Sequence, residues 1–132
     1  MRYYVVFSLL VLSLIGCKKV KIEADDGMFL KKEYVLGEKL RITIDSLSDY
    51  RCPLDPNINC IWQGDVDVFF KITDGVSTMD SVLHFSIDPT EVTFKNYSIK
   101  LLDVSPHTTY QKETSDQVKM LDYKVRMLIV PF

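Results

Sequence analysis

The chain has 132 residues, of which 47% are hydrophobic and 26% charged, with a formal net charge of −2. This length allows one domain with a substantial core and is too short for two ordinary domains. The near-neutral charge leaves no basic field for the phosphate backbone, so we expect no nucleic-acid partner.

The first sixteen residues have the pattern of an export signal. Arg2 is followed by an uncharged apolar run over 3–15. At 1.5 Å per residue this run is too short to cross about 30 Å of hydrocarbon as a helix. We therefore interpret residues 1–16 as a signal peptide that is removed from the mature protein.

The end of this run resembles a bacterial lipoprotein signal, in which a small residue (here Gly16) precedes a cysteine (here Cys17). The resemblance implies cleavage between these residues, diacylglycerol on the Cys17 sulfur and a fatty acid such as palmitate on its amine. Several acyl chains anchor firmly, since each buried methylene contributes about 0.8 kcal/mol. An ordinary signal peptide with a coincidental cysteine is the alternative. Lys18, in place of an aspartate, favours the outer membrane, and residues 17–27 are expected to be a lipidated cysteine with a polar tether.

From Met28 onward, apolar and polar residues alternate with the period of two that is typical of β-strands. The alternation changes phase near Leu102, which predicts a β-bulge. Asp74-Gly75 predicts a two-residue type I′ turn, and 106–117 is polar and is expected to be a loop. The predicted strands are 29–36, 39–45, 65–73, 76–87, 91–94, 97–104 and 118–130.

Short strands joined by turns, with no amphipathic helix, predict one all-β domain over 28–132. We expect an antiparallel β-sandwich, with a small β-barrel as the alternative. The architecture would be immunoglobulin-like without a true immunoglobulin framework. In that framework the tryptophan falls between two distant cysteines, whereas Trp62 follows both Cys52 and Cys60.

With Cys17 assigned to lipid, Cys52 and Cys60 remain as a pair in an oxidising compartment, which predicts a disulfide. Closing so small a loop contributes roughly 2.5 kcal/mol in the chain-entropy model. A zinc site that adds His84 and His107 is the competing interpretation, disfavoured because the ligand spacing is far from that of zinc motifs.

No catalytic motif is present, so we expect a non-enzyme without a cofactor or bound metal. Asp65 and Asp67 would lie about 7 Å apart on one strand face, which we interpret as a solvated face. Neither His84 nor His107 has a partner at a recognisable spacing. Trp62 has two interpretations. Ile61 and Trp62 could pack under the cysteine loop, or Tyr50, Arg51 and Trp62 could form an exposed aromatic–cation cluster that contacts a partner.

The motif Arg51-Cys52-Pro53 followed by Cys60-x-Trp62-x-Gly64 resembles a group of small bacterial lipoproteins and secreted proteins that is common in Bacteroidetes. The resemblance extends to Gly37-Glu38 and to the terminal strand. It implies an all-β domain with a disulfide, and it implies no activity. This chain departs from the group in carrying Asp49-Tyr50 before Arg51 and a longer insert between the cysteines.

These features together predict a lipid-anchored envelope protein whose β-sandwich is a non-catalytic interaction or structural module. It would be held to the membrane through Cys17 and would contact an envelope protein. The alternative from another class is a binder of a small ligand or metal that uses His84 or His107. A third hypothesis is that the proline-bearing loop inhibits a protease.

Overall fold

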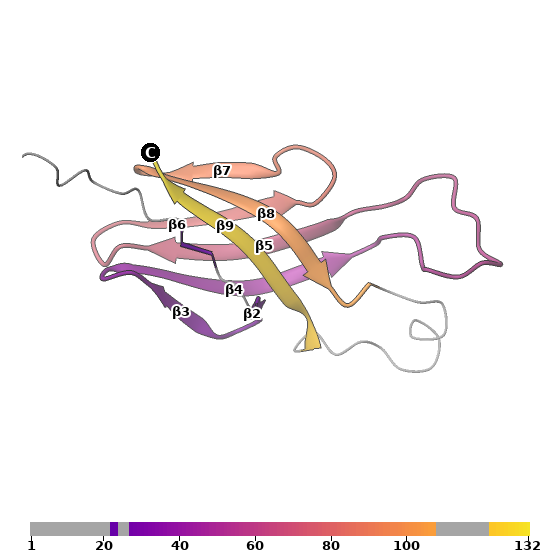
Figure 1. The fold of residues 1–132 in the computed structure, drawn as a ribbon, viewed down its shortest axis with the longest axis horizontal. Coiled ribbons are helices and arrows are strands. Elements are labelled where there is room, and N and C mark those ends of the chain that lie inside the picture. The colour runs from indigo at the N-terminus through magenta and orange to yellow at the C-terminus, as the bar shows by residue number, and fades with distance from the viewer. Residues whose placement is uncertain (1–21, 24–26, 108–121) are drawn as a thin grey trace, which may run out of the picture.

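The computed structural model describes residues 22–23, 27–107 and 122–132. This part of the chain folds as an all-β antiparallel sandwich, as predicted (Figure 1). No helix long and apolar enough to cross a membrane occurs within it. The signal peptide predicted over 1–16 and the lipidation site Cys17 lie outside the described residues.

The sandwich consists of two separate sheets, so the barrel alternative is not the architecture. The first sheet has the order β1-β9-β8-β7, with β2 also paired to β9. Its strands are β1 (Ile22–Glu23), β2 (Met28–Phe29), β7 (Glu91–Phe94), β8 (Tyr97–Ser105) and β9 (Lys124–Pro131). The second sheet has the order β3-β4-β5-β6. Its strands are β3 (Glu33–Leu36), β4 (Leu40–Asp49), β5 (Val66–Thr73) and β6 (Thr78–His84).

The core lies between the sheets and is built from the alternating apolar positions that the sequence shows. Phe70 and Ile72 on β5 and Val125, Met127 and Ile129 on β9 belong to one hydrophobic cluster, and all are almost fully buried. Burial of such side chains is the main favourable term in folding, at roughly 25 cal/mol per Å² of apolar surface. Tyr123 to Ile129 alternates as predicted, although β9 begins only at Lys124 and 118–121 lies outside the described residues.

The single strand predicted over 29–36 is wrong. Met28–Phe29 pairs with β9 in the first sheet, whereas Glu33–Leu36 pairs with β4 in the second. The chain crosses between the sheets at Leu30, which forms a bridge with Ile44, and at Lys31, whose φ is +62°. That left-handed conformation cannot continue an extended strand, so the predicted strand divides at this point.

Other strand bounds also differ from the predictions. β4 continues to Asp49, because a bulge between Ile44 and Ser46 lets the pairing with β5 resume. β6 ends at His84 rather than at residue 87. Asp74-Gly75 belongs to a four-residue connection rather than a two-residue turn, because the Asp74 carboxylate accepts hydrogen bonds from the backbone N–H groups of residues 76 and 77. The bulge predicted near Leu102 is confirmed between Leu101 and Asp103.

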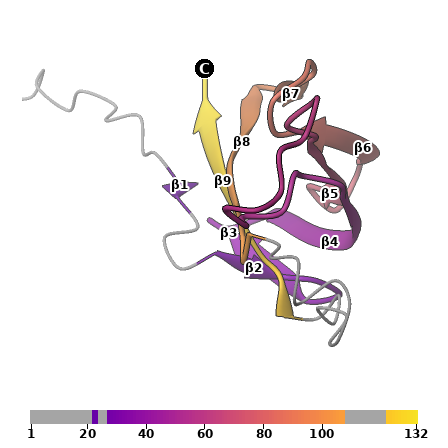
Figure 2. The same cartoon turned by 90° about the vertical axis from the view of Figure 1, so that its right-hand side faces the viewer.

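The long axis of the sandwich has two different ends. One end carries residues 50–65, 85–90 and 105–107, and we call it the cysteine-loop end. The other carries the turns 37–39, 74–77 and 95–96 and the C-terminus at Phe132, and we call it the turn end. The loop around the cysteines extends well beyond the sheets (Figure 1), and Figure 2 shows the molecule with this end facing the viewer. β1 falls inside the segment expected to be a tether, so sheet pairing begins before the predicted domain boundary at Met28.

Candidate functional site at the cysteine-loop end

The cysteine loop, residues 52–60, is closed by the predicted disulfide. Cys52 and Cys60 are bonded, with their Cα atoms 6.1 Å apart. Below the loop the two limbs continue the β4–β5 ladder, because Tyr50 N–H donates to Asp65 O at 3.0 Å and Cys52 N–H donates to Gln63 O at 2.7 Å. The loop is therefore held in place by backbone pairing between the two limbs and by the disulfide that joins its first and last residues.

Gly64 allows the two limbs to cross closely. Its φ is +71°, which is left-handed. A Cβ atom at this position would lie only 2.8 Å from the carbonyl carbon of Tyr50 and 2.9 Å from Cα of Arg51. Only glycine fits this crossing without a backbone shift.

Arg51 is buried, which corrects its predicted place in an exposed cluster. Its side chain forms a bidentate ion pair with Asp49, at 2.8 Å from Nε to Oδ1 and 2.7 Å from Nη2 to Oδ2. It also donates to the carbonyls of Val104, at 2.8 Å, and Pro106, at 3.0 Å. Because these carbonyls belong to β8 and the segment after it, Arg51 joins the base of the cysteine loop to the opposite sheet.

Asp49 is held in its charged form by this arrangement. Burial alone would raise the pKa of Asp49, but the hydrogen bonds and charge of Arg51 outweigh burial and lower it. Tyr123 donates a further hydrogen bond to Asp49 Oδ2 at 3.0 Å and lowers the pKa in the same direction. Three elements distant in sequence therefore meet at one ion pair.

Asp65 is fully buried, so the predicted solvated face of Asp65 and Asp67 is wrong. Its Oδ1 accepts hydrogen bonds from the N–H groups of Val66, Phe85 and Ser86 at 2.8–3.0 Å, and its Oδ2 accepts one from Ile87 at 3.0 Å. These bonds replace strand pairing after His84 and explain why β6 stops there. Nothing in the local sequence signals this role, because the donors lie about twenty residues away along the chain.

Tyr50 and Trp62 form an exposed aromatic pair. Their ring centroids are 5.8 Å apart with 37° between the planes, and the residues are 43% and 58% exposed. The prediction that Ile61 and Trp62 pack under the loop is therefore wrong, because Ile61 is fully exposed as well. Trp62 contributes to the surface and not to an immunoglobulin-type core.

The Tyr50 hydroxyl is fixed by Asp67, which also binds His84. Tyr50 donates to Asp67 Oδ1 at 2.8 Å, and His84 Nδ1 lies 2.5 Å from the same oxygen. The hydrogen bond to Asp67, together with nearby negative charge, raises the pKa of Tyr50 to about 12. Tyr50 therefore remains a neutral hydrogen-bond donor at physiological pH, and its ring is held beside Trp62.

Exposed apolar side chains concentrate at this end. Of the eleven large hydrophobic residues exposed in the described chain, six lie here: Tyr50, Leu54, Ile61, Trp62, Phe85 and Ile87. Exposed apolar groups scattered singly are ordinary, whereas their gathering on one surface is typical of interaction sites.

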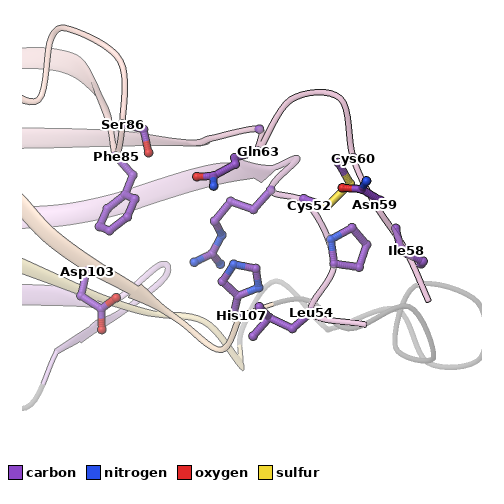
Figure 3. A pocket seen from close by; sticks show the side chains of 13 residues that line it. Cys52, Leu54, Ile58, Asn59, Cys60, Gln63, Phe85, Ser86, Asp103 and His107 are labelled. Atoms are coloured by element: carbon purple, nitrogen blue, oxygen red, sulfur yellow. A yellow bond between two sulfur atoms is a disulfide. The ribbon is translucent and has the colours of Figure 1, made fainter. Parts of the chain in front are cut away.

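A groove of about 480 Å³ lies beside the cysteine loop (Figure 3). Gln63, Phe85 and His107 project into it from three different segments. Its other polar side chains include Asn59, Ser86 and Asp103. Arg51 lines the groove, but its guanidinium is engaged by Asp49 and two carbonyls. The lining is therefore mostly neutral and rich in hydrogen-bonding groups.

The zinc alternative is not supported at these cysteines, because both sulfurs are in the disulfide. In the described residues, no three His, Cys, Asp or Glu side chains gather in a way that could hold a metal ion. Each buried side-chain nitrogen or oxygen there has a hydrogen-bond partner. The polar residues at this end therefore serve first to hold the loop in place.

No protein-family model matches the chain, and neither a curated protein nor a solved structure matches it significantly. What the site can do must therefore be argued from its own geometry.

Proposed function

We propose that this protein is a lipid-anchored envelope protein whose non-catalytic β-sandwich binds another envelope protein through its cysteine-loop end. The observation that carries the proposal is the set of exposed apolar side chains at the cysteine-loop end, above all Ile61 and Trp62, which directly follow the disulfide-closed loop. Tryptophan and tyrosine are enriched among residues that dominate binding energy.

The way the loop is held supports this role. Immobilising a flexible side chain or loop on binding costs affinity, and a preformed surface avoids much of that cost. Here the disulfide closes the loop, Arg51 joins its base to the other sheet, and Asp67 fixes Tyr50 beside Trp62. A loop without a binding role would gain little from three such restraints, since the core lies elsewhere.

The proposed lipid anchor and the proposed cellular compartment are both inferred from the sequence. The proposed diacylglycerol and fatty acid on Cys17 follow from the apolar run ending in Gly16-Cys17, and Lys18 favours the outer membrane. A disulfide agrees with an oxidising compartment such as the periplasm or the cell surface.

The test is a cross-linking pull-down from native membranes with wild-type protein and a Trp62→Ala variant. We expect Trp62→Ala to lose the partner, because truncating such a residue weakens binding by about 2 kcal/mol or more, roughly 30-fold. Val35→Ala is the matched control, since Val35 is an equally exposed apolar residue on β3, outside the cysteine-loop end. Full retention of every partner by both Trp62→Ala and Ile61→Ala would contradict the proposal.

A second candidate function, binding of a small polar ligand, is favoured by the groove beside the loop. Its amide, hydroxyl and imidazole groups and the Phe85 ring suit an uncharged, hydroxyl-rich molecule better than a highly charged one. Native mass spectrometry of the purified protein should then show a retained small molecule that Gln63→Ala releases. No retained molecule, together with no thermal shift on adding a panel of sugars and polyols, would exclude this candidate.

A further inference from the structure

We propose that the turn end of the sandwich rests on the phospholipid headgroups, so that Trp62 and the groove are displayed away from the membrane. This inference deepens the proposed function and rests on the proposed lipidation of Cys17. The lipid surface is the occupant we assign to the turn end.

The pairing of β1 sets the direction from which the anchor arrives. Ile22 pairs with Ile129 and Glu23 pairs with Leu128, antiparallel to β9. The chain that precedes Ile22 therefore leaves toward Pro131, at the turn end. The cysteine-loop end lies at the other end of β9, where Lys124 pairs with Ser105, next to the carbonyls that bind Arg51.

The tether is too short to hold the turn end far from the bilayer. Only residues 18–21 separate Cys17 from Ile22, and this stretch spans at most roughly 17 Å when fully extended. Ile22 lies beside Ile129, and the three residues of extended chain from Ile129 to Phe132 cover about 10 Å. About 10 Å of the tether is therefore needed to reach the turn end. Cys17 can therefore lie at most about 7 Å beyond the sandwich, a distance comparable to the roughly 5–7 Å headgroup layer of one leaflet.

The surface of the turn end suits contact with headgroups. Val76 and Phe132 are 92% and 66% exposed, and nothing in the described chain covers them. Lys95 pairs with Asp74, and Phe132 N–H donates to Asn96 O at 2.9 Å, so the two turns and the C-terminus form one surface. Lysine stems and apolar side chains together are typical of residues at a membrane interface. In the sequence, Lys18, Lys19 and Lys21 add three positive charges between Cys17 and Ile22.

Trp62 lies beyond the reach of the same headgroups in this orientation. The eight residues of β5 separate the two ends by about 25 Å, and Trp62 projects past the start of β5. It follows that the apolar surface at the cysteine-loop end meets a protein in the aqueous space and not the lipid that anchors the chain.

Trp62 is the only tryptophan, so its fluorescence tests the orientation directly. Lipidated protein purified from native membranes would be reconstituted into phosphatidylcholine–phosphatidylglycerol vesicles with and without lipid spin-labelled near the headgroup. We expect wild-type emission to be equal in the two vesicles and to be quenched by aqueous iodide. A Trp62→Phe, Val76→Trp variant should lose emission only in the labelled vesicles. A Trp62→Phe, Phe69→Trp variant, with its probe in the middle of β5, is the matched control and should keep its emission.

Each other result overturns the inference in a distinguishable way. An intact mass without lipid on Cys17 refutes the proposed anchor and the inference with it. A lipidated chain whose Trp62 is quenched, or whose Val76→Trp probe is not, refutes the orientation alone and leaves the anchor standing. A Val76→Trp signal that ignores the lipid label but changes with protein density would assign the turn end to a second copy of the chain.

Discussion

Replacing Asp65 by alanine should be among the most destabilising single changes outside the apolar core. The fully buried carboxylate accepts hydrogen bonds from four backbone N–H groups, three of which belong to residues 85–87. In the described part of the chain, the only strand-like backbone bond of these three residues is the 3.2 Å bond from Phe85 N–H to Val66 O. A net hydrogen bond to a charged group contributes about 1.5–3 kcal/mol. Water can replace part of this loss, because the side chains of residues 85–87 are exposed.

With that discount, we expect Asp65→Ala to lower the free energy of unfolding by about 3–5 kcal/mol. This is a large part of the roughly 5–15 kcal/mol typical of a domain. Asp65→Asn keeps one oxygen for the three Oδ1 bonds but turns an amide N–H toward Ile87, so about 2 kcal/mol should be lost.

The assay is urea unfolding followed by far-ultraviolet circular dichroism with the disulfide intact. Asp80→Ala is the matched control, since Asp80 is exposed on β6 and forms only a 3.6 Å surface pair with Lys71. We expect the control to change stability by less than about 0.5 kcal/mol. An Asp65→Ala protein within about 1 kcal/mol of wild type would refute the view that this carboxylate holds residues 85–87 in place.

Three further predictions concern the same end of the molecule. Gly64→Ala should shift or unfold the segment where Gly64 passes Tyr50, because the added Cβ would clash with the Tyr50 carbonyl and the residue would keep a left-handed conformation. An unchanged thermal unfolding midpoint would contradict this close approach. The lowered pKa of Asp49 means that its pairing with Arg51 contributes fully above the unfolded pKa of about 3.9 and is lost as pH falls through the lower folded value. Urea midpoints measured from neutral to acidic pH should therefore decline less steeply in Asp49→Asn than in wild type, and parallel curves would count against this. The raised pKa of Tyr50 means that its hydrogen bond to Asp67 stabilises the fold below pH about 10 and is lost as pH rises through about 12. In an ultraviolet absorbance titration, the Tyr50 phenolate transition is the one that is absent in Tyr50→Phe. Asp67→Asn should move this transition back toward pH about 10, and an unmoved transition would disprove the link.

The residue pattern was enough to predict the all-β class, the alternating core positions of β5 and β9, the bulge beside Leu102 and the disulfide. These features are local: a period of two assigns side chains to the inner or outer face, and a change of phase marks a bulge within a few neighbouring residues.

Which sheet each strand joins emerged only in the folded domain, because a strand pattern looks the same in either sheet. The division of 29–36 at Lys31 is one example. The same holds for the charged residues. Asp65 and Arg51 are buried because their partners, residues 85–87 in one case and Val104 with Pro106 in the other, come from distant segments of the chain. A charged side chain is buried only where partners compensate its lost hydration. Those partners come together only when the whole sandwich folds, which also leaves Trp62 exposed at the cysteine-loop end.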